Sequence, residues 1–245
     1  MKLTDAEFRC APLYRQGALI ALVLVCAWIS ETAEAAFVTR SNTTTGFADA
    51  SVITRSIVFT ASDFGGPVSL DDVNVTISFA KTNNNAFLPA SRNVPSGTPY
   101  FNEIQFILTS PSGTQVRLIS NGSSSQESFL SGSSGFKGTI TFDQSAPTLV
   151  NANRRVLTSG TFRPANPPNQ SLNSFNAQDP LGTWTLSIGD DVAQDGLSFY
   201  SYSLGLTVHA LPEPRSIGLW GSLALVILSI FGHRARRQSS TQQFA

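Results

Sequence analysis

The sequence predicts an all-β fold, a jelly-roll β-sandwich formed by residues 36–210. Apolar and polar residues alternate strictly in several short runs, which places the two kinds of side chain on opposite faces of a strand. Turn-forming pairs such as Asn121-Gly122 and Asp195-Gly196 separate these runs. No stretch between residues 36 and 210 shows a sustained helical period. Many short strands divided by such turns are typical of β-sandwiches and jelly rolls.

Alternation predicts three strands most clearly, at residues 73–79, 184–188 and 202–208. Every second residue in each run is apolar, so we expect one face of each strand to be buried. Residues 120–135 and 163–174 are rich in Ser, Gly, Asn and Pro, and are expected to be long surface loops. Shorter apolar runs predict four further strands, at residues 52–59, 104–108, 116–119 and 139–142.

The first segment, residues 1–35, has the pattern of a helical secretory signal peptide. Two arginines precede an apolar run at residues 17–29, which is shorter than the about 20 residues that a membrane span needs. The small residues Ala33 and Ala35 follow, and they predict cleavage by signal peptidase before Ala36. An N-terminal anchor that is retained is the alternative.

The last segment, residues 211–245, has three parts. It begins with Pro212-Glu213-Pro214, whose prolines fix the backbone and prevent a helix from passing through. Residues 217–232 then predict a transmembrane helix, slightly short for the hydrocarbon core. Basic residues after a span favour the cytoplasmic side, which would place the central segment outside the cell. These basic residues lie in the segment 233–237, which contains Arg234, Arg236 and Arg237.

This order of proline motif, apolar helix and arginine cluster resembles the PEP-CTERM sorting signal of exported bacterial proteins. The resemblance implies cleavage at the motif by an exosortase, an integral-membrane enzyme. One departure is that residues 238–245 extend beyond the arginines. An ordinary C-terminal anchor with a proline hinge is the alternative, and both interpretations tether the central domain to the cell envelope.

The charges divide along the same three segments. The chain has 16 basic and 16 acidic residues, and its zero net charge sums −1 in residues 1–35, −2 in residues 36–210 and +3 in residues 211–245. This balance excludes a strongly basic nucleic-acid binder, so no nucleic-acid partner is expected. Both cysteines, Cys10 and Cys26, lie in the predicted signal peptide, so we expect the mature domain to have no disulfide.

The central segment resembles the P domain, also called Homo B, over residues 68–208. Residues 103–114 look like the strand and turn of that family, and residues 175–190, with the run Asp179-Pro180-Leu181-Gly182, are similar to its second signature. Residues 195–204 follow in the expected order. The P domain is the jelly roll that follows the catalytic domain in proprotein convertases and many bacterial subtilisin-like proteases, so the resemblance implies this fold.

Three positions depart from the P-domain pattern. Tyr202 stands where the family usually has Trp in the last strand, and Glu103 replaces the usual Asp of an Asp-Leu pair. The His that is frequent after the early strand is absent, and Lys81-Thr82 lies near that place. These replacements keep the expectation of the fold but argue against an inherited metal site.

The sequence favours a non-catalytic domain. A nucleophilic triad needs a base beside a hydroxyl, usually His, and the single His of the central segment is His209 at its end. No nucleophile-elbow, zinc-protease or phosphate-binding glycine motif occurs. A serine-endopeptidase label could arise because P domains accompany proteases, but a chain of this length does not hold a protease domain as well.

One candidate metal site and one weak binding pattern stand out. Asp190, Asp191 and Asp195 lie close together in sequence, and their oxygens could bind Ca²⁺, although the spacing is not that of an EF-hand. The alternative is that these carboxylates form a solvated turn. No other cofactor is expected.

Several aromatic residues near loops could stack on sugars, although packing in the core is favoured: Phe64, Phe129, Phe136, Phe162, Phe199 and Tyr200.

Together these expectations describe an exported bacterial protein of the cell envelope or extracellular matrix. It would act by adhesion or scaffolding in association with exopolysaccharide, held in the membrane by its C-terminal helix or released by processing. Signal peptidase and exosortase would be its processing enzymes. The alternative is an accessory domain that serves a separate secreted subtilisin-like protease. An autonomous hydrolase would need carboxylates or serines that act without histidine.

Overall fold

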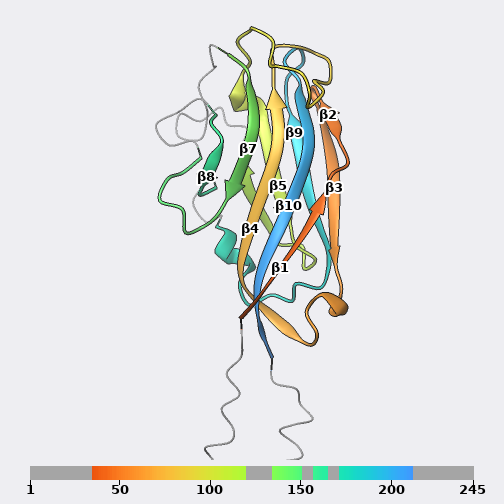
Figure 1. Ribbon diagram of the computed structural model, residues 1–245, viewed down its shortest axis with the longest axis vertical. Helices are drawn as coiled ribbons and strands as arrows, with labels where there is room; N and C mark the ends of the chain where they lie inside the picture. Colours follow the sequence, from red (N-terminus) through yellow and green to blue (C-terminus); the bar gives the residue numbers. More distant parts are fainter. Residues whose placement is uncertain (1–34, 120–133, 151–156, 165–170, 212–245) are drawn as a thin grey trace, which may run out of the picture. The chain divides into compact units, whose positions relative to one another are not determined.

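Two β-sheets pack face to face in the computed structural model, which describes residues 35–119, 134–150, 157–164 and 171–211 (Figure 1). The prediction of an all-β sandwich is therefore confirmed. The predicted signal helix and the predicted transmembrane helix lie outside the described residues. Within the four described ranges, no helix has the length and apolar character needed to cross a membrane.

The first sheet is built around two long central strands. Among the described residues its order is β1-β10-β4-β7-β8, and β2 also pairs with β10. All neighbours are antiparallel except β7 and β8, which are parallel. The strands are β1 (Ala35–Asn42), β2 (Gly46–Ala48), β4 (Val68–Lys81), β7 (Phe136–Phe142), β8 (Gly160–Phe162) and β10 (Leu197–Ala210).

The second sheet has the order β3-β9-β5-β6 and is antiparallel throughout. Most connections cross between the sheets, because β3 leads to β4, β4 to β5, β6 to β7, β8 to β9, and β9 to β10. Its strands are β3 (Ser51–Phe59), β5 (Ile104–Thr109), β6 (Gln115–Ile119) and β9 (Gly182–Asp190). Short 3-10 turns are η1 (Ala61–Asp63), η2 (Phe101–Glu103) and η4 (Leu172–Phe175).

All seven predicted strands are present, and most are longer than predicted. The inward positions of β4, β9 and β10 carry apolar side chains that are wholly buried between the sheets. Three strands were not predicted, namely β1, β2 and β8. In β1 six of eight residues are exposed, and β2 and β8 are each three residues long, so neither kind of strand leaves a pattern of alternation.

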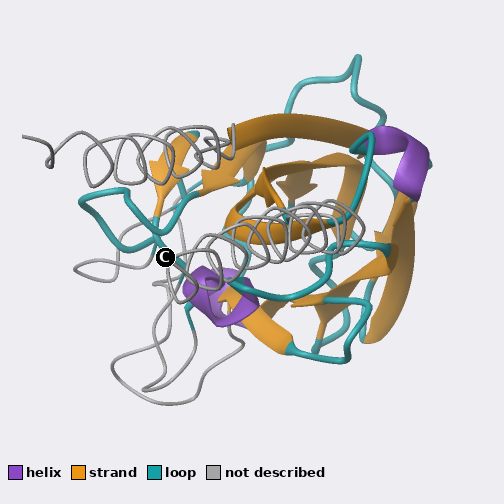
Figure 2. Ribbon diagram, turned by 90° about the horizontal axis from the view of Figure 1, so that it is seen from below, coloured by secondary structure: helices purple, strands orange, loops and turns teal. Residues whose placement is uncertain are grey.

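The apolar core lies between the two sheets. Figure 2 shows the backbone of these sheets along the long axis of the sandwich. Trp184 on β9 is wholly buried against Phe175, with ring centroids 5.1 Å apart. Its indole N–H donates to the carbonyl of Pro180 at 3.0 Å. Tyr202 on β10 is buried too, and its hydroxyl donates to the carbonyl of Arg55 at 3.2 Å. The polar atoms of these large core side chains are therefore satisfied.

The sandwich has two distinct ends, defined by the register of β10. At the proximal end Ala35 pairs with His209 and Val68 pairs with Ala210, so β1 begins where β10 finishes. At the distal end Leu197 pairs with Lys81, where β10 begins and β4 finishes. The loops of the distal end therefore lie at the opposite end of the strands from the first and last described residues (Figure 1).

We expect Trp184→Ala to lower the free energy of unfolding by about 3–5 kcal/mol, because it removes a large buried side chain and leaves a cavity. Trp184→Phe should cost less, since most of the apolar contact remains. The control is Val58→Ala on the exposed face of neighbouring β3, which should change stability by no more than about 0.5 kcal/mol. Urea denaturation of the purified proteins measures all three, and equal effects at both positions would contradict this packing.

Candidate functional site

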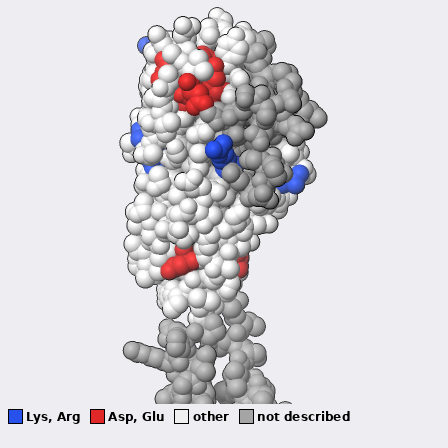
Figure 3. Space-filling model, turned by 180° about the vertical axis from the view of Figure 1, so that it is seen from behind, with Lys and Arg blue, Asp and Glu red and all other residues white. Residues whose placement is uncertain are grey.

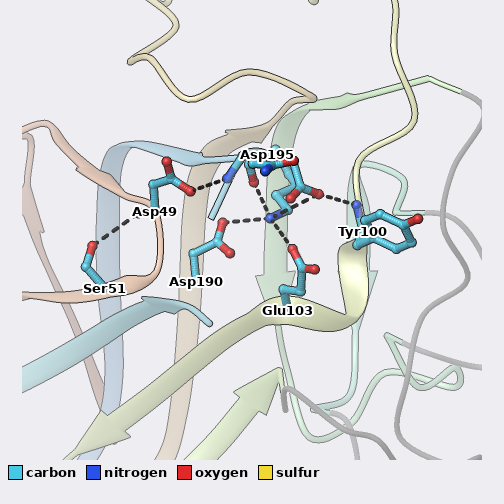
Figure 4. Close-up of polar contacts among 8 residues, drawn as sticks. Asp49, Ser51, Tyr100, Glu103, Asp190 and Asp195 are labelled. Atoms are coloured by element: carbon cyan, nitrogen blue, oxygen red, sulfur yellow. Dashed lines mark hydrogen bonds and ion pairs between the residues drawn. The ribbon is translucent and has the colours of Figure 1, made fainter. Parts of the chain in front are cut away.

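A lysine side chain is buried among three carboxyl groups at the distal end (Figure 4). Nζ of Lys81 donates to Oδ2 of Asp190 at 2.7 Å and to Oε2 of Glu103 at 3.1 Å. It also donates to the backbone carbonyl of Asp195, whose carboxylate Oδ2 lies 3.6 Å from Nζ. The Lys81 side chain has no exposed surface. We call these four residues the Lys81 cluster.

The Lys81 cluster joins the two sheets. Lys81 is the last residue of β4, and it follows the inward-facing Ile77 and Phe79 at the next alternate position. Asp190 is the last residue of β9 in the opposite sheet, and Glu103 ends η2 directly before β5. Because Asp190 pairs with Ile104, the residue after Glu103, the two carboxyl groups enter the interior side by side.

The fourth member, Asp195, belongs to the loop between β9 and β10. Its carboxylate accepts a hydrogen bond from the backbone N–H of Tyr100. The residue before it, Gln194, has φ of +103°, a conformation that residues other than glycine rarely adopt. The Gln194 N–H donates to Oδ1 of Asp49 at 2.9 Å. Asp49 on one side and Lys81 on the other thus hold the loop in a strained conformation.

Burial sets the charge of the cluster. Desolvation raises the pKa of Glu103 to about 7, although Lys81 lowers it, and Asp195 adds a further increase. Desolvation likewise raises the pKa of Asp190 to about 6 against the lowering effect of Lys81. Three carboxyl groups face one amine, so the amine does not balance them all. Near neutral pH the cluster therefore holds a proton on a carboxyl group for part of the time.

The structure brings two of the three predicted calcium ligands together. Asp190 and Asp195 meet at Lys81, whereas Asp191 is exposed and its backbone N–H donates to the carbonyl of Glu103 at 3.2 Å. Among the described residues, no group of three or more His, Cys, Asp or Glu is arranged to hold a metal ion. Calcium binding stays a prediction, but this donor set does not suit the ion because the Lys81 amine occupies its centre.

The sequence pattern did not predict that Lys81 and Glu103 contact Asp190. A signal was available, because Lys81 falls on the inward side of a strand whose other inward residues are apolar. A charged residue at such a position needs a buried partner. Glu103, which lies directly before β5, reaches this lysine from the opposite sheet.

The predicted processing sites fall at the limits of the described chain. Ala35 and Ala36 are the first residues of β1, and Ala36 pairs with Val208. Ala33 lies outside the described residues, as do the sorting motif at 212–214 and the arginines of residues 233–237.

His209 lies at the proximal end, away from the Lys81 cluster. Its Nδ1 is 2.6 Å from Oδ1 of Asp71, and both side chains are more than a third exposed. This is the surface position expected of a residue at the end of the last strand.

Most of the aromatic residues that the sequence analysis placed near loops have buried or partly buried side chains. Phe136, Phe199 and Tyr200 are buried, which confirms core packing for these three. Phe64 and Phe162 are partly buried against the core, and Phe129 lies outside the described residues. Among the described residues, the aromatic side chains exposed at the distal end are Tyr100 and Phe87, neither of which the sequence analysis singled out.

Charge is unevenly distributed over the surface. Figure 3 shows the larger group of acidic side chains at the distal end, smaller acidic groups near the proximal end, and a few basic side chains between them. Of the described acidic residues at that end, Asp191 is exposed and Asp49 is half-buried, whereas Glu103, Asp190 and Asp195 are buried. No protein-family model matches the chain, and no curated protein matches it either.

We expect stability to fall as the pH rises from about 4.5 to about 7, because Glu103 keeps its proton in the folded protein over a range where the unfolded chain has lost it. Below about pH 4.5 Glu103 is protonated in both the folded and the unfolded protein, so its contribution to the free energy of unfolding is fully present. Glu103→Gln should reduce the slope, leaving the smaller contribution of Asp190. The control is Asp72→Asn on β4, whose half-buried carboxylate lies outside the cluster and accepts a hydrogen bond from Asn74 at 2.9 Å. Thermal unfolding across this range measures the effect, and an unchanged slope in Glu103→Gln would contradict it.

Proposed function

We propose that this chain is an exported, non-catalytic binding or scaffolding protein of the bacterial cell envelope or extracellular matrix. The observation that carries the proposal is the common position of the two ends of the domain. β1 begins beside the end of β10, and the N–H of Leu211 donates to the carbonyl of Pro67 at 2.9 Å at that same end. A signal peptide before β1 and a sorting tail after β10 would therefore both leave from the proximal end.

The P-domain interpretation has support in where the matching stretches fall. Residues 103–114 supply the end of η2, all of β5 and the turn toward β6, and residues 182–190 are β9. The buried Trp184 lies in the second of these stretches. The repeated crossing of the chain between the two sheets is typical of a jelly roll. We therefore assign the sandwich to the jelly-roll class and propose a P-domain-like topology.

The proposed processing fits the limits of the strands. Cleavage by signal peptidase before Ala36 would leave β1 paired with β10 along almost its whole length. The motif Pro212-Glu213-Pro214 follows the last described residue, Leu211, so an exosortase would cut just beyond the folded domain. Before that cut the proposed helix at residues 217–232 would tether the proximal end, and the distal end would face away from the membrane.

The distal end has features that suit a carbohydrate partner. Tyr100 is 53% exposed and Phe87 38% exposed, and Val192 on the loop before β10 is also exposed. Aromatic faces can stack on sugar rings, and neighbouring carboxylates can accept hydrogen bonds from sugar hydroxyl groups. We therefore propose exopolysaccharide as the partner and the distal end as the surface that binds it.

The tail hypothesis predicts the mass of the mature protein. We expect protein isolated from its own host to begin at Ala36 and to lack residues 215–245, because both signals would have been removed. Intact-mass measurement and sequencing of the terminal peptides test this directly. A product that still carries residues 215–245 would exclude sorting by an exosortase and leave an ordinary anchor.

The binding hypothesis predicts a role for Tyr100. We expect Tyr100→Ser to reduce retention of the exported protein on the host's extracellular polysaccharide by about tenfold, because a stacking aromatic ring is lost while the backbone N–H to Asp195 remains. The matched control is Phe37→Ser, which removes a 64% exposed aromatic ring near the proximal end and should bind normally. Affinity electrophoresis in gels that contain the polysaccharide measures retention. Equal retention of all three proteins would exclude the distal end as the binding surface.

A further inference from the structure

The Lys81 cluster holds an amine against a carboxyl group in the interior of the protein. Nζ of Lys81 lies 2.7 Å from Oδ2 of Asp190, and neither side chain has any exposed surface. The other oxygen of Asp190, Oδ1, is buried and has no hydrogen-bond partner among the described residues. Glu103 lies on the same amine, at 3.1 Å. A nucleophile, a carboxyl group that can be attacked and a second carboxyl group thus meet in one place.

Placement of this kind favours amide formation. Reacting groups that are held in contact behave as if they were at effective concentrations of about 10⁵ M or more, provided that the attacking atom is aligned. In water a carboxyl group near neutral pH is an unreactive carboxylate, but burial raises its pKa and favours the protonated form that an amine can attack. Exclusion of bulk water also removes the reagent that would hydrolyse the product.

We propose that Lys81 and Asp190 condense to an intramolecular isopeptide bond, with Glu103 as the general acid and base. This would be a covalent modification of the chain by its own residues, and it needs no cofactor, oxidant or added enzyme. It does not depend on the proposed function.

The reaction starts from the Lys81 ammonium, the Asp190 carboxylic acid and the Glu103 carboxylate. Glu103 accepts a proton from Nζ, and the freed electron pair of Nζ attacks Cγ of Asp190 to give a tetrahedral intermediate. Glu103 then gives this proton to the departing hydroxyl group and accepts a second proton from the nitrogen. The C–O bond breaks, the Nζ–Cγ amide bond forms, and one water molecule leaves. Glu103 ends as the carboxylic acid, so protons and charge balance.

The assignment of roles follows burial and distance. Asp190 is the carboxyl group nearest to Nζ and is wholly buried, whereas the Glu103 side chain keeps some exposed surface through which a proton can exchange. The carboxylate of Asp195 is farther away, at 3.6 Å, and accepts the N–H of Tyr100. Burial raises the pKa of both Asp190 and Glu103, so this pair retains a proton near neutral pH, and the reaction proceeds from the state in which Asp190 carries that proton and Glu103 is ionised.

The bond would link β4 of the first sheet to β9 of the second. Both cysteines of the chain lie at residues 10 and 26, before the described domain, so this domain has no disulfide to hold its sheets together. A covalent link between residues so distant in sequence would restrict the unfolded chain in the way that a disulfide does. It would be insensitive to reducing agents.

Peptide mapping of the purified full chain tests the proposal. After denaturation and digestion with trypsin and chymotrypsin, mass spectrometry should find a branched peptide that joins the segment of Lys81 to the segment of Asp190. Its mass should equal the sum of the two linear peptides minus one water. Trypsin should fail to cut after Lys81, because an acylated lysine is not a substrate. Cleavage after Lys81, with both peptides linear at full mass, would overturn the proposal.

Variants test the role of each residue by the same mapping. Lys81→Arg and Asp190→Ala should abolish the branched peptide, and Glu103→Gln should reduce its yield by at least about tenfold although both reacting groups remain. Asp72→Asn, a change on β4 outside the Lys81 cluster, should keep the full yield. A branch that persists in Asp190→Ala and maps to Glu103 would overturn the assignment to Asp190. Undiminished yield in Glu103→Gln would overturn the role of Glu103. The native protein decides whether the bond exists even if a variant does not fold.

Discussion

The antiparallel ladder between β4 and β10 is the constraint on which the rest of the structure depends. Each strand has 14 residues, and they pair from Leu197 with Lys81 at one end to Ala210 with Val68 at the other, with two irregularities in register. β7 pairs with the free edge of β4, and β1 and β2 pair with the free edge of β10. The alternation of side chains along this ladder directs one apolar face at the second sheet. The ladder also fixes which loops share an end.

At the distal end of this ladder, the inward-facing position that follows the apolar residues of β4 is occupied by a charged side chain, Lys81. The side chain of Lys81 takes the place that an apolar residue would hold, so the interior must supply oxygen atoms to it. Strands and loops from both sheets meet there for this reason. Because the carboxyl groups outnumber the amine, the interior holds ionisable groups whose protons are shared near neutral pH.

Much of the fold could be predicted from sequence, because alternation is a local signal. Residues 73–79, 184–188 and 202–208 each place apolar side chains on one buried face, and all three lie in strands. β1 could not be predicted in this way, because most of its side chains are exposed and its place depends on backbone pairing with β10. The Lys81 cluster was predicted only in part. The proximity of Asp190 and Asp195 is local in sequence, but their contact with residue 81 depends on how the two sheets pack.

The shared position of the two ends has a mechanical consequence. A pull applied to the chain beyond Leu211 enters the domain at the end of β10 and acts along that strand, while its neighbours β1 and β4 run antiparallel on both sides. The interstrand hydrogen bonds are perpendicular to this direction, so they resist together in shear and do not open one after another. If the resisting force is applied at the distal loops, the whole length of β10 lies between the two points of attachment. Such a geometry slows forced unfolding, which depends on the rate of unfolding and not on equilibrium stability.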